Sequence, residues 1–508
     1  MAISRPSSRA GAGANAEGVA ARSTTLFVAG VTLLGGLLRF ATLDAKSFWH
    51  DEALTVLVLN HHFGGMLAAI RDTEATPPLY YALAWLWSKP FGLGEIGLRS
   101  LSALVGTAVV PVVYAAGRDL VSRRAGLAAA GVAAVNPLLV WYSQEARTYS
   151  LSVLASAVAF WGFIRALDGR SHGLALWWAG STVAILSRYL AAPAFVIEAV
   201  WLLWDRRRRG SELRPVIVAS APPLVAAVGL VPLALSQTSS TDPAVWISSA
   251  SLPSRIVEVP GAFLVGFESP RLVLVGAIAC LLVVPALWVV LRAIRRGAMP
   301  RVTPAIGVPL AGVALTLLLA LAGKDYFLHR NLIDLLVPVL LVLGAGFTAA
   351  GVLGRWSLAG LCGLSLFVLV ATAWQPKFDR EDWRSAAAAI GPAARPRAVV
   401  ATPGAEAWRP LAVYSGTRRM RKGTAVSEVA VLASARRPIG STERPTVPRP
   451  ETGTPPAPEF AQIARRTGDR WTLLLFRAAR PVRLTPAILA RAKLDPGSRA
   501  VVLLQEPK

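Results

Sequence analysis

The chain has 508 residues, of which 54% are hydrophobic and 16% charged, and its mean hydropathy is +0.51. Soluble domains carry about 25% charged residues, and the apolar excess here falls in nearly uncharged runs of about 17–22 residues, long enough to cross a bilayer core of about 30 Å. This excludes a soluble enzyme, a disordered protein and a secreted disulfide module. Because the runs are continuously apolar rather than alternating, we expect membrane-spanning helices and not barrel strands.

The net charge of +24 would suggest nucleic-acid binding in a soluble protein. In a membrane protein arginines instead mark cytoplasmic loops and anionic lipid surfaces, so we expect membrane lipids and no nucleic acid as partners. Both cysteines, Cys280 and Cys362, lie inside apolar runs and predict neither a disulfide framework nor a zinc site. Residues 1–23 are predicted to be a disordered cytoplasmic tail, followed by a retained span rather than a cleaved signal peptide.

Eleven spans are predicted, together with one shorter apolar segment, residues 77–88, which we interpret as an interfacial helix. The approximate spans are 24–43, 99–117, 125–142, 149–165, 174–187, 190–204, 215–235, 271–291, 304–323, 332–351 and 356–374. With the N-terminus inside, the inside segments carry 18 basic residues and the outside loops before residue 375 carry 8. If residues 77–88 crossed, the arginines at 206–209 would face outward, against the positive-inside rule.

We therefore expect an α-helical polytopic protein, N-in and C-out, with a membrane domain at 24–374 that includes a long first outside loop at 44–98. Residues 375–508 would form a small α/β domain outside, because short strand-like stretches occur at 398–402, 411–414, 471–476 and 500–504. A Pro-rich stretch at about 437–458 is expected to be disordered. Most loop carboxylates lie on the predicted outer face, and so does the expected acid–base chemistry.

The first chemical cluster is Phe48-Trp49-His50-Asp51-Glu52-Ala53, just past the first span. Adjacent carboxylates near a membrane surface are costly unless they are paired or functional. Neighbouring helical residues point about 100° apart, so only one of the two can face a given centre. The alternative is structural: Asp51 caps a helix over 52–60, and Glu52 interacts with its dipole.

Three further clusters lie on the same predicted face. Residues 141–149 offer a carboxylate, a guanidinium and phenols, and the structural alternative there is a Glu145–Arg147 pair with interfacial aromatic residues. Residues 324–331 hold three candidate cations, for which lipid headgroup contact is the alternative. Residues 377–384 follow the last span, and the alternative is a helix start capped by Asp379.

A carboxylate beside cations fits sugar transfer from a lipid phosphate, because the base takes a proton from an acceptor hydroxyl while the cations stabilise the departing phosphate. Arginine suits the second task with its forked, permanent charge. We find no Walker-type loop and no dinucleotide-binding fingerprint. The activated donor on this face is therefore expected to be lipid-linked rather than a nucleotide sugar.

These motifs resemble the GT-C glycosyltransferases, in particular the branch of family 39/83 type that holds protein O-mannosyltransferases, aminoarabinose transferases and the rhizobial galacturonosyltransferase-like bacterial enzymes. The resemblance covers about 350 residues, with the motifs in family order. They are Trp49 to Ala53, Thr76 to Tyr81, Phe91 to Ser100, Tyr142 to Tyr149, Tyr326 to Arg330, and Asp382 to Arg384.

The resemblance implies a polyprenyl-phosphate sugar donor, inversion at the anomeric carbon, and a catalytic domain at 24–374. It implies Asp51 as the catalytic base, with its neighbour Glu52 as a second catalytic residue, and Arg330 on the lipid phosphate, with His329, Lys324 and Tyr326 as further donor-binding residues. Further pocket candidates are His50, Pro77, Pro78, Tyr80, Glu145, Arg147, Tyr149 and Arg188. Because the acidic ligands and Trp-Trp-Asp element of the oligosaccharyltransferase branch are not found in the sequence, no obligatory metal is expected.

The expected function is transfer of a hexose or pentose to a cell-envelope glycan, lipid or protein acceptor outside a bacterial plasma membrane. The main alternative is a polytopic transporter or lipid-glycan flippase. That function calls for polar residues along the middle of several spans, whereas mid-span charge is nearly limited to Glu198, with Asp334 near a span end. A third alternative is a scaffold whose outside domain binds a cell-wall polymer.

Overall fold

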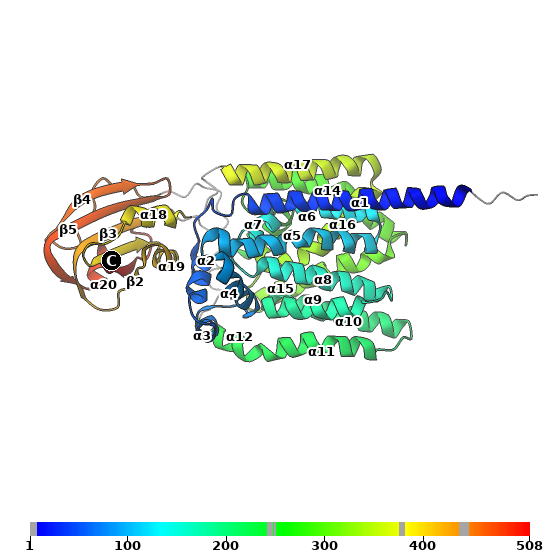
Figure 1. The fold of residues 1–508 in the computed structure, drawn as a ribbon, viewed down its shortest axis with the longest axis horizontal. Helices are drawn as coiled ribbons and strands as arrows, with labels where there is room; N and C mark the ends of the chain where they lie inside the picture. The colour runs from blue at the N-terminus through cyan, green and yellow to red at the C-terminus, as the bar shows by residue number, and fades with distance from the viewer. Residues whose placement is uncertain (1–7, 241–246, 248–249, 375–380, 436–446, 508) are drawn as a thin grey trace, which may run out of the picture.

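The computed structural model describes residues 8–240, 247, 250–374, 381–435 and 447–507. Figure 1 shows a bundle of long helices lying side by side, with a small sheet domain at one end. Helix α1 (Ser8–Phe40) begins at the other end, and the turn between α10 and α11 lies there as well. The arginine-rich turn and the C-terminal domain therefore sit at opposite ends of the bundle, as the charge-based orientation requires; which face of a membrane each end meets stays a prediction.

Every predicted span coincides with one helix or a consecutive pair. After α1 the bundle helices are α5 (Glu95–Leu120), α6 (Arg123–Val135), α7 (Pro137–Ser143), α8 (Tyr149–Leu167), α9 (Gly173–Ser187), α10 (Ala192–Arg208), α11 (Arg214–Gly229), α12 (Val231–Ser240), α13 (Leu252–Val265), α14 (Leu272–Arg295), α15 (Thr303–Leu321), α16 (Leu336–Ala349) and α17 (Gly351–Trp374). Within the described residues, seven helices are long and apolar enough to cross a membrane, or eight if α6 and α7 form one bent span. The predicted number of eleven spans stays a prediction.

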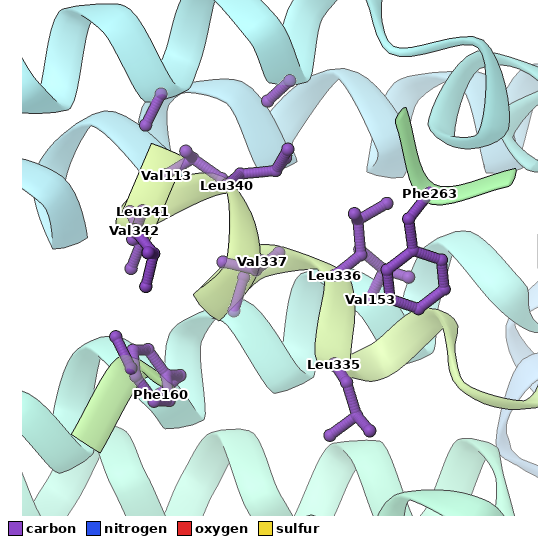
Figure 2. Close-up of a cluster of buried hydrophobic side chains, with 14 of the residues drawn as sticks. Val113, Val153, Phe160, Phe263, Leu335, Leu336, Val337, Leu340, Leu341 and Val342 are labelled. Carbon is purple, nitrogen blue, oxygen red and sulfur yellow. The ribbon is translucent and has the colours of Figure 1, made fainter. Parts of the chain in front are cut away.

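Helix α16 occupies the centre of the bundle. Its residues from Leu336 to Phe347 are almost all buried, as expected for a helix that is apolar on every side. Figure 2 shows its leucine and valine side chains pointing both towards Val113 and Val153 and towards Phe160. Gly344 faces the backbone of α6 at Ala125 so closely that a Cβ atom would clash.

The break between α6 and α7 lies against the end of α1. Pro137 bends the pair by 55°, which leaves carbonyl groups near the end of α6 without helical partners. The fully buried Arg39 of α1 donates to Ala133 O at 3.2 Å and Ala134 O at 3.0 Å, and to Ser143 Oγ at 3.2 Å. Buried backbone groups are thus satisfied, and residues 143–148 are fixed against the end of α1.

The first long loop folds into three short helices across this end of the bundle, α2 (His50–Leu59), α3 (Phe63–Thr73) and α4 (Leu79–Phe91). Helix α4 corresponds to the segment interpreted as interfacial, and at 13 residues it is too short to cross a bilayer. A small apolar core that includes Phe48, Met66, Tyr81 and Leu98 holds the three helices on α5. This layer carries the first chemical cluster.

The C-terminal domain is a six-stranded mixed sheet in the order β2-β6-β1-β3-β5-β4, in which only β1 and β3 are parallel neighbours among the described strands. The strands are β1 (Arg397–Thr402), β2 (Arg418–Arg419), β3 (Thr424–Ser434), β4 (Phe460–Thr467), β5 (Trp471–Leu484) and β6 (Val501–Gln505), and the helices are α18 (Trp383–Ile390), α19 (Gly404–Ser415) and α20 (Pro486–Leu489). Helices α18 and α19 lie between the sheet and the bundle (Figure 1). The expected helical membrane protein with a small C-terminal α/β domain is confirmed.

Three local predictions differ from the structure or lie outside it. The strand predicted at 411–414 is the last turn of α19, because Ala407, Leu411 and Ser415 form one buried helical face and a four-residue apolar run does not distinguish the two structures. Residues 8–23 of the expected disordered tail are helical, in keeping with their many alanines. Residues 436–446 of the expected disordered stretch are outside the described residues, whereas β4 follows at Phe460.

Candidate active site

Asp51 is the second residue of α2, at the end of the bundle that meets the C-terminal domain. The helix begins without a side-chain cap: the N-cap residue is Trp49, whose side chain makes no capping hydrogen bond. The structural alternative, in which Asp51 caps a helix over 52–60, is therefore wrong. Asp51 is half-buried, and its backbone carbonyl accepts a hydrogen bond from Thr55 Oγ1 at 3.2 Å. Its carboxylate is left for interactions outside the helix.

Glu52 points in a different direction and is fully buried. Arg99 of α5 donates to both of its oxygens, with Nε–Oε1 at 2.8 Å and Nη2–Oε2 at 2.6 Å. The backbone N–H of Ala146 donates to Oε1 at 2.9 Å. The Arg99 guanidinium also binds the carbonyl groups of Leu43 and Ser47. This carboxylate ties α2 to α5 and to the α7–α8 loop, so its contacts support a structural role, and the catalytic role of Glu52 stays a prediction.

Arg147, in the α7–α8 loop, is placed beside Asp51 by Glu74. Nη1 donates to Glu74 Oε1 at 2.8 Å and Nη2 to Glu74 Oε2 at 3.1 Å, and both side chains are buried. Nη1 also lies 2.8 Å from Tyr81 Oη and 3.3 Å from the Asp51 carbonyl oxygen. The Glu145–Arg147 pair of the structural alternative is therefore wrong: Arg147 pairs with Glu74, and Glu145 Oε1 accepts from Trp141 Nε1 at 2.9 Å.

Positive charge surrounds the Asp51 carboxylate. Burial acts to raise the pKa of Asp51, but the charges of Arg147 and Arg330 outweigh it. Arg409 acts in the same direction, so the pKa of Asp51 lies below its ordinary value. Asp51 is therefore ionised at neutral pH. Arg147, Arg330 and Arg409 come from the α7–α8 loop, the α15–α16 loop and the C-terminal domain, so the fold brings three distant segments to one carboxylate.

The loop that carries Arg330 is held by its own ion pair. Arg255 of α13 donates to both oxygens of Asp325, at 2.8 Å and 2.5 Å, and to the carbonyl oxygen of Phe327 at 2.6 Å. Burial acts to lower the pKa of Arg330, but Tyr149, Tyr142 and Asp51 keep it above its ordinary value. The guanidinium is thus a permanent charge in a partly buried, phenol-lined position.

His329 differs from the expectation that it serves as a cation. Its ring stacks on Phe267 with centroids 4.5 Å apart, and its Nδ1 lies 3.5 Å from Glu258 Oε1. Burial, and then the neighbouring charge of Arg330, lowers the pKa of His329 to about 3. The imidazole is therefore neutral at physiological pH and supplies no charge to a phosphate.

Two further predicted pocket residues, Tyr149 and Arg188, lie near Arg330. Tyr142 and Tyr149 pack with ring centroids 4.4 Å apart, and the Arg188 guanidinium lies 5.0 Å from the Tyr149 ring centroid. Asp334, in the 3-10 turn Ile333–Leu335 before α16, holds Arg188 through a 3.1 Å ion pair. The structure therefore brings Tyr149 and Arg188 together, and Tyr149 acts on the charge of Arg330.

The other predicted residues frame the site or lie at its edge. Pro77 is buried and Pro78 is the N-cap of α4, so both set the start of that helix. Tyr80 is buried with its hydroxyl 3.1 Å from Ser102 Oγ, whereas it is the neighbouring Tyr81 whose hydroxyl contacts Arg147. Lys324 is exposed just after α15, and Tyr326 is half-buried two residues later.

The C-terminal domain contacts this layer through α19 and the start of α18. The backbone N–H of Phe48 donates to Tyr414 Oη at 2.7 Å, and that hydroxyl donates to Glu95 Oε1 at 2.6 Å. Ser47 Oγ accepts from the backbone N–H of Trp383 at 3.1 Å. One turn before Tyr414 on α19, Arg409 Nη1 lies 2.7 Å from His50 Nε2.

These contacts determine the protonation state of His50. Burial, and then the charge of Arg409, lowers the pKa of His50 to about 4. The ring is therefore neutral at physiological pH, and Arg409 Nη1 donates to it. Sequence reasoning found His50 but gave no signal for Arg409, which is one of many arginines in residues 375–508. It also missed Glu74 and Tyr81, although both lie in the loop where the chemistry was expected.

A groove opens beside the site between α1, α7 and α17. Its cavity volume is about 190 Å³, and it is lined mainly by apolar side chains, with Thr42, Lys46, Gln144, Glu268 and Thr372 as its polar members. Two of its wall residues adjoin the site: Trp141 donates to Glu145, and Phe267 stacks on His329. In the part of the chain that the structure describes, no group of three His, Cys, Asp or Glu side chains is placed to hold a metal ion.

Comparison with solved structures gives distant similarities. ArnT from Cupriavidus metallidurans in the apo state is 15% identical with a TM-score of 0.42, and the match covers 65% of this chain and 60% of that one. The Saccharomyces cerevisiae protein O-mannosyltransferase Pmt1–Pmt2 complex bound to the sugar donor is 18% identical over 42% of this chain and 33% of that one, with a TM-score of 0.33. The Archaeoglobus fulgidus oligosaccharyltransferase with Zn and sulfate is 14% identical over 72% and 55%, with a TM-score of 0.42. The chain thus spans about 60% of the length of the ArnT chain it matches.

A search of curated proteins gives no match. The family model described as dolichyl-phosphate-mannose-protein mannosyltransferase matches residues 75–234, which run from the loop before α4 into α12 and include Arg147, Tyr149 and Arg188. Over residues 75–234 the chain is therefore similar to the mannosyltransferase family that its sequence motifs also resemble.

Proposed function

We propose that the chain transfers a sugar from a polyprenyl-phosphate-linked donor to a hydroxyl group of an extracytoplasmic acceptor, with inversion at the anomeric carbon. The proposal rests on one arrangement above all: an ionised aspartate, Asp51, surrounded by Arg147, Arg330 and Arg409 at the predicted outer end of the bundle. An isolated base needs no such ring of cations, whereas a reaction that releases a phosphate does.

In this mechanism the Asp51 carboxylate accepts the proton of the acceptor hydroxyl as its oxygen attacks the anomeric carbon. The new carbon–oxygen bond forms while the bond from that carbon to the phosphate oxygen breaks, and the phosphate leaves with the electron pair. Attack from the face opposite the phosphate inverts the configuration. Arg330 stabilises the charge that develops on the departing phosphate, with a forked guanidinium suited to two phosphate oxygens.

The charges around Asp51 also couple donor binding to base strength. In the free protein Arg147 and Arg330 hold the pKa of Asp51 below its ordinary value, which makes it a weak base. A donor phosphate beside Arg330 would neutralise part of that positive charge. The pKa of Asp51 would then rise, so the carboxylate becomes a better proton acceptor when the donor is in place. Glu74 keeps Arg147 from forming a full ion pair with Asp51, because the Glu74 carboxylate binds both Nη1 and Nη2 of Arg147.

We place the polyprenyl chain in the groove between α1, α7 and α17. Its lining is largely apolar, and its walls at Trp141 and Phe267 lie next to the residues that surround Arg330. A chain in this groove would put its phosphate near the site while its tail remains among the membrane lipids. The lipid-linked sugar is the only small molecule the mechanism needs, and Asp51 and Arg330 carry out both charge-bearing steps without an obligatory metal.

The acceptor in this proposal is a glycan, lipid or protein outside the plasma membrane of a bacterium. The test is to delete the gene in its own organism and to analyse both surface glycans and lipid-linked sugars. Loss of one surface sugar together with accumulation of that sugar on polyprenyl phosphate supports the proposal. Both changes should be reversed by the wild-type chain and by neither Asp51→Asn nor an empty vector.

A transporter or flippase gives a different pattern. Its loss would hold the lipid-linked sugar on the inner side of the membrane, where added impermeant enzymes that cleave the sugar cannot reach it from outside. If Asp51→Asn restores the surface sugar as well as the wild-type chain does, the proposed chemistry is wrong. A scaffold would change neither pool of sugar.

A further inference from the structure

Arg409 belongs to the C-terminal domain but lies in the site of the membrane domain. It is on α19, and its Nη1 donates to His50 Nε2 at 2.7 Å, one residue from Asp51. Among the described residues, Nη1 is the one side-chain atom of Arg409 with a hydrogen-bond partner, and the buried Nε has none. A guanidinium carries five N–H donors. Most of the binding capacity of Arg409 is therefore unused, and a buried donor without a partner is costly.

Arg409 and Arg330 come to the site from different elements, Arg330 from the α15–α16 loop and Arg409 from α19 of the C-terminal domain. The charged and polar groups that act most strongly on Arg330 are Tyr149, Tyr142, Asp51 and Glu145, which, apart from Asp51 of α2, belong to the bundle helices and their loops. Those that act most strongly on Arg409 are Asp51 and Glu74, in the layer of short helices, and Arg147, in the α7–α8 loop. The carboxylate of the proposed base thus interacts with one arginine from the bundle and with another from the C-terminal domain.

A residue next to Arg409 adds a surface suited to sugars. The Trp408 ring has the Arg409 guanidinium 5.1 Å and the Arg419 guanidinium 4.3 Å from its centroid, on α19 and β2. An aromatic face packs well against the C–H face of a sugar ring, and flanking arginines favour anionic groups on that sugar. Trp408 is half-buried.

The charge of the whole C-terminal region agrees with an anionic ligand. Residues 375–508 contain 24 Lys and Arg residues against 11 Asp and Glu residues, a net charge of +13. A basic surface raises the local concentration of anionic polymers and speeds their association. A neutral acceptor would gain nothing from this charge.

From these observations we propose that α19 forms the acceptor side of the site and that Arg409 binds a carboxylate or phosphate group of an anionic acceptor glycan. This inference rests on the proposed function, because it takes the hydroxyl that Asp51 deprotonates to belong to that glycan. Arg330 then serves the donor phosphate and Arg409 serves the acceptor. The C-terminal domain would be a substrate-binding part of the enzyme.

The test measures binding of fluorescently labelled oligosaccharides to the full chain in phosphatidylcholine nanodiscs at physiological ionic strength. The probes are an oligogalacturonate for the carboxylate, an oligomeric polyglycerol phosphate for the phosphate, and a neutral dextran oligomer of similar length. We expect one of the anionic probes to bind and the neutral one to bind far more weakly. Arg409→Ala should weaken that binding by roughly tenfold or more, the value of one charge-assisted contact.

The control is Arg418→Ala, since Arg418 is an exposed arginine of the same domain that pairs only with the exposed Glu506 among the described residues. It should bind the anionic probe like the wild-type chain. Arg409→Lys keeps the charge but loses the fork, and we expect an intermediate affinity. The unfolding temperature of each variant shows whether it is folded. Equal binding of neutral and anionic probes, or equal losses in the Arg409 and Arg418 variants, would overturn the inference.

Asp51→Asn separates this inference from the proposed function. Removing a negative charge beside Arg409 should leave binding of the anionic probe unchanged or tighter, although it should abolish transfer. If that variant binds the probe normally and also transfers sugar normally, the proposed base is wrong while the role of Arg409 stands. If transfer is lost as expected and Arg409→Ala binds as the wild-type chain does, the acceptor-side inference alone fails.

Discussion

Glu74 and Arg147 form a two-point ion pair in a buried position, with Nη1–Oε1 at 2.8 Å and Nη2–Oε2 at 3.1 Å. The two residues are 73 positions apart, at the end of α3 and in the α7–α8 loop. The same guanidinium reaches the Asp51 carbonyl oxygen and Tyr81. The pair therefore connects the layer of short helices to the bundle at the point where the proposed base is held.

The Glu74–Arg147 pair predicts that Glu74→Gln destabilises the protein. The amide keeps the shape of the carboxylate but leaves a buried guanidinium without its counter-charge, which costs about 3 kcal/mol in comparable buried pairs. The measurement is the unfolding temperature in detergent or nanodiscs. Asp72→Asn is the matched control, because the Arg71–Asp72 pair has side chains that are 61% exposed and should contribute little. Equal unfolding temperatures for wild type and Glu74→Gln would contradict this role.

Glu52→Gln should affect the protein differently from a change at Asp51. Glu52 binds Arg99 and the Ala146 N–H, so its loss should lower the unfolding temperature and reduce the rate through misplacement of the α7–α8 loop. The folded fraction should retain measurable transfer with an unchanged pH profile. A complete loss of transfer without any loss of stability would instead assign proton transfer to Glu52.

Arg330→Gln should weaken binding of undecaprenyl phosphate, because a phosphate loses a charged hydrogen-bond partner. Such a contact is worth about 1.5–3 kcal/mol, or roughly a 10- to 100-fold change in affinity. The neighbouring His329→Gln is the control: that imidazole is neutral, with a pKa lowered to about 3, and its removal takes no charge from the site. Binding of undecaprenyl phosphate to each variant in nanodiscs decides the matter. Equal losses in both variants would show that the stacked His329, rather than the charge of Arg330, carries the binding.

The charges around Asp51 also predict the pH dependence of kcat/KM. The free protein needs Asp51 ionised, and its pKa lies below the ordinary value because Arg147 and Arg330 outweigh burial. As the pH falls from neutrality, kcat/KM of the wild-type chain should therefore stay level towards the ordinary aspartate pKa of about 3.9. Arg330→Gln removes a positive charge, which raises the pKa of Asp51, so its acid limb should begin at a higher pH. A limb that moves to lower pH in this variant would show that Arg330 does not act on Asp51.

The membrane helices could be predicted because their signal is local. Continuous apolar runs appear directly in the sequence, and each predicted span coincides with a helix or a consecutive pair. The Pro137 break was not predicted, because what makes it tolerable is Arg39, about a hundred residues earlier, binding the carbonyl groups that the proline leaves free. The stretch 411–414 was assigned to a strand because its buried partners on α19 lie outside a four-residue window.

The candidate site could be predicted in part for the same reason. Asp51 was found because it directly follows the first span, and Arg330 because it lies in a short loop between two spans. The pairing of Arg147 with Glu74 rather than Glu145 depends on how α3 folds back, which adjacency in sequence does not show. The charge of His329 depends on burial against Phe267. Arg409 reaches the site only because an entire domain docks on α2, so no local pattern marks it.

The most direct test of the account is the rate of sugar transfer by Asp51→Asn, measured beside its affinity for undecaprenyl phosphate. The lipid-linked sugar that accumulates in cells lacking the chain serves as donor. We predict that transfer falls by about 10²- to 10⁴-fold, the usual contribution of a general base, while undecaprenyl phosphate binds as tightly as to the wild-type chain or more tightly. Transfer at an undiminished rate by a folded Asp51→Asn protein would contradict the account.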